Sequence, residues 1–443
     1  MLNNNLNFLK QQQHSEAYVI LGKKLWDMHR FDGAEQCFKK SLILNTDNFA
    51  AIKNLARLFE RTNQVIPAHE YARKGLKINP KDPELNFVAA KLDRRRGQIK
   101  DAINRLNNLL NFDLENKLRQ KFHFELGRLY DLDGNANQAF FHFKKGNKYA
   151  EKSAIKSHFD KKNSIKEISD LTALMDDPRV LSAFKKSNKK SKDSPIFLIG
   201  FPRSGTTLLD QILDSHPDLQ VLEERPTTNS MKRIIENMPK SYPFALLEDL
   251  KEKEINLLKE SYFQTVDQYL TRLSGCKLID KLPLNIVRIP LILKVFPNAK
   301  FILAIRNPYD VCFSCFSHNF KMTGHMANFL SLEDTAFYYD KVMRLWQLYN
   351  SKFKLQFHTI KLENVIANFK TEVQQLLNFL DVDWDDAVLD YHQNTIKRKY
   401  IKTPSYHQVS EKINSKGINR SQRYPQMESV KTILMPFIKY FEY

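Results

Sequence analysis

The 443-residue sequence lacks three features that would assign it to a particular class of proteins. Its four cysteines are too few for a disulfide framework, so a reducing compartment such as the cytoplasm is the expected location. No apolar run approaches the roughly 20 residues that a helix needs to cross a bilayer. The Asn- and Gln-rich N-terminus lacks the charged-then-apolar pattern of a signal peptide. We therefore expect no membrane span and a cytoplasmic location.

Acidic residues are also scarce relative to basic ones. The chain has 69 Lys and Arg against 50 Asp and Glu, which gives a net charge of +19. This charge favours anionic partners such as nucleotides, acidic peptides, sulfated or phosphorylated polymers, or nucleic acid. The positive net charge can equally well reflect a composition bias toward Lys and Asn that keeps the protein soluble. We expect no nucleic-acid partner, and we interpret the basic run at 184–194 as a solvated linker rather than a nucleic-acid arm.

The N-terminal third of the chain repeats itself with a period of 34 residues. Small residues recur at two positions of this period: Gly22, Ala34, Ala56, Ala68, Ala90 and Ala102. This spacing is typical of tetratricopeptide repeats, in which two antiparallel helices cross closely at small side chains. Such units stack into a solenoid with a concave surface. After a disordered segment at 1–14, we predict that 15–183 form the repeats and a capping helix.

The remainder, 195–443, alternates between strand-like and helical patterns. The candidate strands are residues 196–199, 277–279, 300–305 and 355–360. Alternation of this kind indicates an α/β domain with a mostly parallel sheet and helices on both faces. Ligands of such sheets bind at the carboxyl ends of the strands.

The first strand leads into a glycine-rich turn and then a helical pattern. Residues 200–207 read Gly-Phe-Pro-Arg-Ser-Gly-Thr-Thr. A strand, a tight turn and a helix start present backbone N–H groups and a helix dipole to a phosphate. The glycine spacing matches the nucleotide loop G-x-x-x-x-G-K-[ST], but Thr206 occupies the lysine position. The loop therefore suits a donor without a triphosphate tail, and a kinase is disfavoured.

Further polar patches follow the other strand candidates. Glu223 and Glu224 stand beside an arginine, so one of the two carboxylates could act as a general base. Lys281 lies just past a strand. Arg306 also ends a strand, and Ser314 follows it by two helical turns, which makes a second anion cradle. Two cradles suit a donor with two separate anionic ends.

These motifs resemble those of the sulfotransferases, specifically the tyrosylprotein sulfotransferases and their soluble relatives with tetratricopeptide repeats. Pro-Arg-Ser-Gly-Thr-Thr at 202–207 resembles the family's 5′-phosphosulfate loop, and Arg-Asn-Pro at 306–308 resembles its 3′-phosphate motif. Thr-Pro-Ser at 403–405 is similar to its closing segment. The resemblance covers 195 to about 425. It implies a P-loop-type sulfotransferase domain that uses 3′-phosphoadenosine-5′-phosphosulfate (PAPS) as donor and needs no metal.

The resemblance also implies which residues hold PAPS. Those expected at the 5′-phosphosulfate are Arg203, Ser204, Gly205, Thr206 and Thr207. Arg306 and Ser314 are expected at the 3′-phosphate. Ser405 and Arg420 fall on donor-contacting positions of the closing segment.

Glu224 falls on the family's catalytic base, and Lys281 on the lysine that steadies the transferring sulfuryl group. The alternative base is His216, because small-molecule sulfotransferases use a histidine. The sequence departs from the family at a few positions. Asn307 replaces an aspartate, and Lys361 stands where a tyrosine that contacts the donor is usual.

The resemblance thus implies transfer of a sulfuryl group from PAPS to an acceptor hydroxyl, most simply a tyrosine of a peptide or protein bound by the repeats. Polysaccharide, lipid and small-molecule acceptors are alternatives. An alternative of another class is a protein-binding module, in which the repeats recruit a partner and the second domain is a degenerate nucleotide fold.

Overall fold

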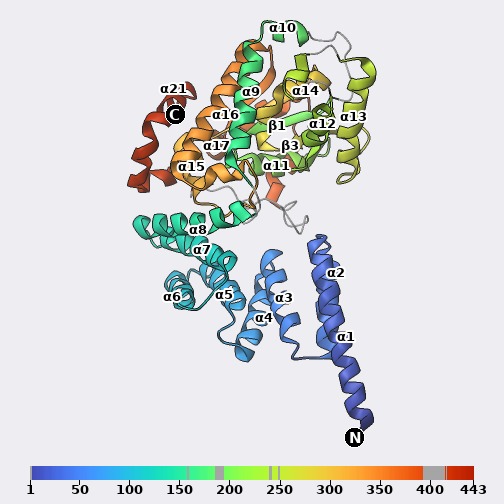
Figure 1. Cartoon of the computed structure of the whole chain (residues 1–443), viewed down its shortest axis with the longest axis vertical. Coiled ribbons are helices and arrows are strands. Elements are labelled where there is room, and N and C mark those ends of the chain that lie inside the picture. The colour runs from blue at the N-terminus through green and yellow to red at the C-terminus, as the bar shows by residue number, and fades with distance from the viewer. Residues whose placement is uncertain are drawn as a thin grey trace. The chain divides into compact units, whose positions relative to one another are not determined.

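The computed structural model divides the chain into two compact units, Met1–Ala150 and Glu151–Tyr443 (Figure 1). The structure describes residues 2–156, 159–184, 194–238, 242–247, 250–392, 415 and 417–443. The described part of the first unit is entirely helical, whereas the second contains a sheet. Among the described residues, no helix is both long and apolar enough to cross a bilayer.

The first unit is built from helical hairpins. Its helices are α1 (Leu2–Asp27), α2 (Phe31–Leu44), α3 (Phe49–Arg61), α4 (Val65–Ile78), α5 (Pro83–Arg95), α6 (Ile99–Leu110), α7 (Asn116–Leu132) and α8 (Ala136–Lys156), the last of which crosses the boundary. Ala34, Ala68 and Ala102 are fully buried in α2, α4 and α6. A Cβ on Gly22 would overlap the Phe38 ring, which explains why this position needs a small residue. The all-helical solenoid predicted from the 34-residue period is confirmed.

The chain start differs from the prediction of a disordered segment at 1–14. Helix α1 begins at Leu2 and runs through this segment. Ser15 anchors it, because its buried hydroxyl donates to the carbonyl of Ser41 on α2 at 3.0 Å. The Asn- and Gln-rich composition hid this helix, since it lacks an apolar stripe.

The boundary between the units also differs from the predicted one. Helix α9 (Lys161–Asp176), which we predicted to cap the repeats, packs in the second unit on α16 (Leu332–Lys352). Lys161 bonds Asp334 at 2.7 Å. The short helix α10 (Val180–Ala183) follows, and most of the linker predicted at 184–194 lies outside the described residues. An amphipathic pattern shows that a helix buries one face but not which unit it buries that face against.

The second unit has a five-stranded, wholly parallel sheet. Its strands are β1 (Ile196–Gly200), β2 (Leu219–Glu223), β3 (Lys277–Lys281), β4 (Lys300–Ile305) and β5 (Gln356–Lys361), in the order β2-β3-β1-β4-β5. The predicted parallel sheet is confirmed. Strand β2 was not predicted, because the sequence around Glu223 and Glu224 was interpreted only as a pair of carboxylates that follows a helix.

Helices cover both faces of this sheet, as predicted. The first face packs on α11 (Thr206–Asp214), α17 (Leu362–Ala367) and α18 (Phe369–Phe379) through aliphatic side chains. The second face carries Phe197 and Phe301 and packs on aromatic residues of α13 (Glu252–Asp267) and on Phe296. The remaining helices are α12 (Thr227–Glu236), α14 (Ile289–Val295), α15 (Pro308–Phe316) and α21 (Lys431–Tyr440).

Candidate functional site

The turn between β1 and α11, which we call the phosphate loop (residues 201–205), depends on its two flanking glycines. A Cβ on Gly200 would overlap the carbonyl oxygen of Ala304 on β4. Gly205 has φ +94°, in the left-handed region that favours glycine, and precedes Thr206 at the start of α11. The first backbone N–H groups of a helix have no intrahelical partner. The loop therefore offers donors to an anion, as predicted.

Arg203 connects this loop to the second predicted cradle. Its backbone lies at φ +73°, and its Nε donates to the hydroxyl of Ser314 on α15 at 3.0 Å. Arg306, at the end of β4, donates from Nη1 to the Arg203 carbonyl at 3.4 Å. Arg203 thus meets Arg306 and Ser314, which follow it by more than 100 positions in the chain, beyond the carboxyl ends of β1 and β4.

Arg306 is held by acceptors but keeps one donor unused. Its Nη2 donates to the Gly417 carbonyl and lies 3.6 Å from the Asp310 carboxylate. Its Nε is buried and has no hydrogen-bond partner among the described residues. A buried donor without a partner is costly, so this atom is a candidate contact for a bound anion.

Asp310 fastens the closing segment to this cradle. Its carboxylate accepts from the backbone N–H of Asn419 at 2.7 Å and of Ser421 at 2.8 Å. Arg420, between them, donates to Ser317 at 3.4 Å, and its guanidinium lies 5.0 Å from the Phe313 ring centroid. The predicted residue Ser405 lies outside the described residues.

Lys281 is the centre of a buried charge cluster at the neighbouring strand ends. Its side chain is fully buried, and Nζ lies 3.0 Å from Glu224 Oε1, 3.3 Å from Asp210 Oδ2 and 3.5 Å from Glu223 Oε1. Burial alone would lower the pKa of Lys281, but the carboxylates of Glu224, Asp210 and Glu223 outweigh it and raise the pKa. The ammonium therefore remains charged.

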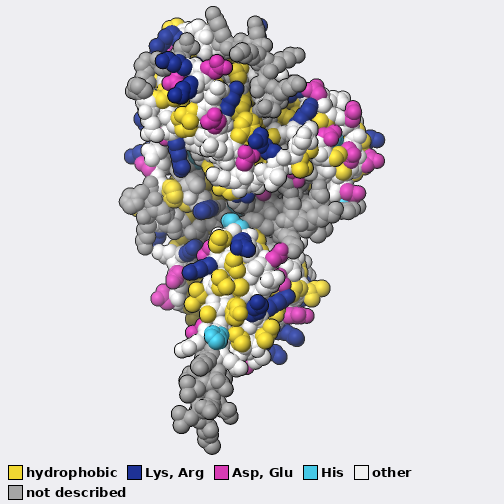
Figure 2. Space-filling view, turned by 90° about the vertical axis from the view of Figure 1, so that its right-hand side faces the viewer, with side chains coloured by type: hydrophobic (Ala, Val, Ile, Leu, Met, Phe, Trp, Pro, Cys, Tyr) yellow, Lys and Arg dark blue, Asp and Glu magenta, His cyan; other side chains and the backbone are white. Residues whose placement is uncertain are grey.

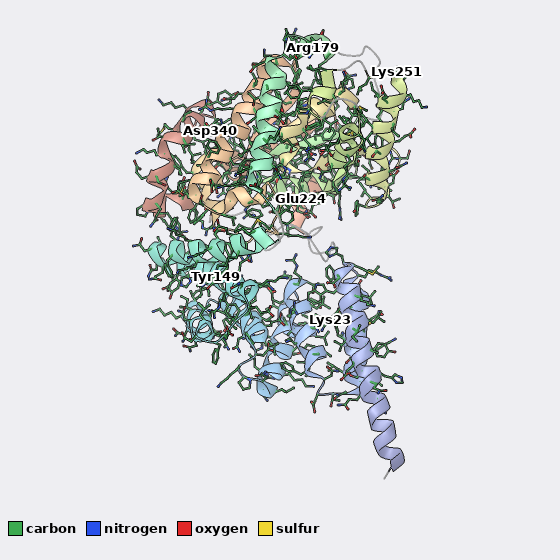
Figure 3. All side chains as sticks on the ribbon, in the orientation of Figure 1. Lys23, Tyr149, Arg179, Glu224, Lys251 and Asp340 are labelled. Atoms are coloured by element: carbon green, nitrogen blue, oxygen red, sulfur yellow. The ribbon has the colours of Figure 1, made fainter. Side chains whose placement is uncertain are left out.

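The strand register explains how these groups meet. Parallel pairing sets Glu223 on β2 directly beside Lys281 on β3, so both side chains point to the face that α11 covers. Helix α11 crosses that face and presents Asp210. Glu224 follows β2 at φ +45° and donates its backbone N–H to the Lys281 carbonyl at 2.8 Å. Figure 3 labels Glu224, whose side chain is 33% exposed and is the most accessible of the three acids.

The neighbouring Asp280 points to the opposite face and takes no part in this cluster. Its carboxylate accepts from Thr227 at 2.6 Å and from Tyr262 at 2.9 Å. Burial raises the pKa of Asp280 to about 6, although both hydrogen bonds and the charge of Lys281 oppose the shift. Asp280 thus anchors α12 and α13 to the sheet.

His216, the alternative base, precedes the amino end of β2, whereas Glu224 follows its carboxyl end. Strand β2 runs from residue 219 to 223 and separates His216 from Glu224. Its Nδ1 accepts from the N–H of Asp218 at 3.1 Å, which leaves Nε2 to donate to the Asp383 carbonyl at 2.8 Å. Both ring nitrogens serve the local structure.

The structure shows the contacts of Asn307 and Lys361, the two residues at which the sequence departs from the family pattern. Asn307 caps α15, since its side chain accepts from the Tyr309 N–H at 3.0 Å, which an aspartate would also do. Lys361 ends β5, and its Nζ lies 5.2 Å from the ring centroid of Tyr443. Tyr443 in turn donates to Glu363 at 3.0 Å.

Two site residues were missed from the sequence: Asp210 and Asp310. Both are acids inside otherwise apolar helical stretches, and that was the available signal, since a buried carboxylate needs a partner. Lys281 lies 71 positions from Asp210, and the backbone N–H groups that donate to Asp310 lie about 110 positions from it.

The region that contains this site is similar in sequence to known proteins. Residues 195–386 match the model of the sulfotransferase family. An uncharacterized protein of Aquifex aeolicus is 30% identical over 260 residues, which cover 56% of this chain and 33% of that protein. The protein-tyrosine sulfotransferase of Drosophila melanogaster is 27% identical over 46% of this chain and 41% of its own length. Protein-tyrosine sulfotransferase 1 of Homo sapiens is 26% identical over 47% and 58%.

The matched region therefore spans between a third and three fifths of these relatives. Among solved structures, the sulfotransferase domain of the Synechococcus PCC 7002 olefin synthase aligns with a TM-score of 0.43 at 21% identity, over 58% of this chain and 98% of that domain. Residues 195–386, which follow an all-helical repeat unit, match the model of the sulfotransferase family over less than half of the chain.

Proposed function

We propose that this chain transfers a sulfuryl group from PAPS to an acceptor hydroxyl, and that the acceptor is a tyrosine of a peptide or protein. The observation that carries the proposal is the meeting of Arg203, Arg306 and Ser314 beyond the strand ends. This arrangement gives two neighbouring anion cradles, one in the phosphate loop and one around Arg306 and Ser314. The phosphate loop lacks the lysine of a triphosphate site.

The residues present fit PAPS. Its 5′-phosphosulfate suits the phosphate loop, where Ser204, Thr206 and Thr207 are buried beside the open N–H groups of α11. Its 3′-phosphate suits Arg306, whose Nε lacks a partner, together with Ser314. PAPS supplies an activated sulfuryl group, and the protein contributes binding, orientation and charge.

Lys281 and Glu224 are suited to the transfer itself. The charged ammonium of Lys281 can stabilise negative charge that develops on the departing oxygen. A tyrosine hydroxyl has a pKa of about 10, so its attack on sulfur is helped when the Glu224 carboxylate accepts the proton. The carboxylates of Asp210 and Glu223 pair with the Lys281 ammonium and orient it, and both are less exposed than Glu224.

The tyrosine acceptor rests on the likeness to protein-tyrosine sulfotransferases, which covers less than half of the chain. Polysaccharide, lipid and small-molecule acceptors would use the same donor and the same two catalytic groups. The acceptor therefore has to be tested separately from the donor.

Donor binding is tested by calorimetry with adenosine 3′,5′-bisphosphate and adenosine 5′-monophosphate, which differ only in the 3′-phosphate. We expect the bisphosphate to bind at least tenfold more tightly, because each charge-assisted hydrogen bond to Arg306 contributes about 1.5–3 kcal/mol. Arg306→Ala should remove this preference, while Arg344→Ala, on the exposed surface of α16, serves as the control. Equal affinity for both nucleotides in the wild-type protein would sink the assignment of the 3′-phosphate cradle.

A further inference from the structure

Three alternate helices of the first unit, α3, α5 and α7, present a surplus of positive charge on one face. Helix α3 packs on α5, and α5 packs on α7 (Figure 1). Their cations lie close enough to influence one another or to share the Glu84 carboxylate. The residues of this surface, which we call the basic face, are Lys53, Arg57, Lys91, Lys117 and Lys121.

Lys121 is the cation of the basic face whose charge is least compensated by the described residues. It is half-buried and has no hydrogen bond or ion pair with any residue that the structure describes. Burial lowers the pKa of Lys121, the nearby charge of Arg57 lowers it further, and Lys117 and Lys91 add to the effect. Only Glu84 opposes them. The fold thus holds a cation where its charge is disfavoured, and a bound anion would relieve that cost.

The carboxylates of the basic face are already shared among its cations. Glu84 lies 3.3 Å from Lys53 Nζ and 3.4 Å from Arg57 Nη1. Glu60 bonds Lys91 at 2.8 Å and also pairs with an arginine on the same helix as Lys91. In the described part of the chain, Glu60 and Glu84 therefore already pair with other cations, and neither is left to form an ion pair with Lys121.

Aromatic rings lie between these cations. Phe87 and Phe122 stack with centroids 5.5 Å apart, and Lys91 Nζ lies 4.9 Å from the Phe87 centroid. The Arg57 guanidinium lies 5.6 Å from the Trp26 centroid. Phe87 and Trp26 are partly exposed, so they offer apolar contact to the side chains that separate acidic residues in a peptide.

We propose that the basic face binds an acidic stretch of polypeptide and thereby recruits the protein acceptor. This inference rests on the proposed function, because it takes the acceptor to be a polypeptide. The side-chain carboxylates of such a stretch can pair with these recessed cations, as Glu84 already does with Lys53 and Arg57.

A nucleic acid fits this surface less well. Lys53, Arg57 and Lys91 are only 25%, 35% and 24% exposed, so they lie recessed between helices. The carboxylates of Glu60 and Glu84 stand among them and would repel a continuous phosphate backbone. Figure 2 shows Lys and Arg side chains interspersed with acidic ones on the face that it presents.

The test measures binding of three fluorescent probes to the full chain: a 12-residue peptide of Glu and Asp around one Tyr, its Gln and Asn counterpart, and a single-stranded oligonucleotide of equal charge. We expect only the acidic peptide to bind well. The double variant Arg57→Gln/Lys121→Gln should weaken its binding at least tenfold. Lys100→Gln, on the exposed surface of α6, removes a charge elsewhere and should leave binding unchanged.

Two further readouts separate recruitment from a structural role. Lys121→Gln alone should not lower the melting temperature, because it removes a charge that the fold disfavours. The double variant should raise KM for the acidic peptide and leave kcat and transfer to a small phenol unchanged. Unaltered peptide affinity in the double variant, or tighter binding of the oligonucleotide, overturns the proposal. Loss of peptide binding in a chain that transfers no sulfate would sustain the basic face and refute the proposed activity instead.

Discussion

Replacing Lys281 with Met is expected to abolish sulfuryl transfer and to lower the free energy of unfolding by about 3–5 kcal/mol. Lys281 is fully buried, and so is Asp210. Removing the ammonium leaves the Asp210 carboxylate, and the largely buried Glu223, without the cation that offsets their desolvation. Urea-induced unfolding measures the loss of stability, and an assay of labelled sulfate transfer measures the loss of activity.

A second variant separates these two effects. In Lys281→Met/Asp210→Asn the uncompensated charge is removed together with its partner, so much of the lost stability should return. Activity should not return, because the cation that stabilises the departing oxygen is still missing. A Lys281→Met protein as stable as the wild type would contradict the buried charge cluster.

Glu224→Gln is expected to leave the fold and donor binding intact and to reduce kcat by about 10²- to 10⁴-fold, the usual contribution of a general base. The amide keeps the size and one acceptor oxygen of the carboxylate but cannot take the phenolic proton. Glu224 is also the acid of the cluster that solvent reaches most readily, so its replacement perturbs burial least. Single-turnover kinetics with labelled PAPS and titration of adenosine 3′,5′-bisphosphate measure the two properties.

Two controls belong with this experiment. Glu223→Gln keeps Glu224 and should reduce kcat much less, because Glu223 orients Lys281 rather than contacting the acceptor. His216→Asn should change stability and not kcat, since both ring nitrogens bond backbone groups at the opposite end of β2 from Glu224. Loss of turnover in the His216 variant with a normal Glu224 variant would move the base to His216.

The parts of the candidate site that depend on local sequence could be located before the structure was known. The glycines around the phosphate loop are required by close approach and by backbone angle, so they are visible in the sequence. Arg306 ends a strand whose apolar run is unmistakable, and the spacing of Ser314 from it follows the helical period. The 34-residue period likewise reflects helix crossings that recur in every unit.

The missed features depend on contacts between distant segments. Asp210 gains its role only because the β2–β3 register brings Lys281 under α11. Asp310 acts through backbone N–H groups of Asn419 and Ser421, which leave no trace in side-chain patterns. Helix α9 was assigned to the wrong neighbour because its apolar face alone does not identify the surface that covers it.

The most direct test of the central claim is transfer of label from [35S]PAPS, compared with ATP labelled in the γ-phosphate, to a panel of acceptors: a tyrosine peptide, its phenylalanine counterpart, an oligosaccharide and a small phenol. We predict 35S incorporation into the tyrosine peptide, none into the phenylalanine peptide, and no transfer from ATP. Transfer to the oligosaccharide or the phenol alone would keep the donor site and refute the tyrosine acceptor. Absence of 35S transfer to every acceptor, with no binding of adenosine 3′,5′-bisphosphate, would contradict the account.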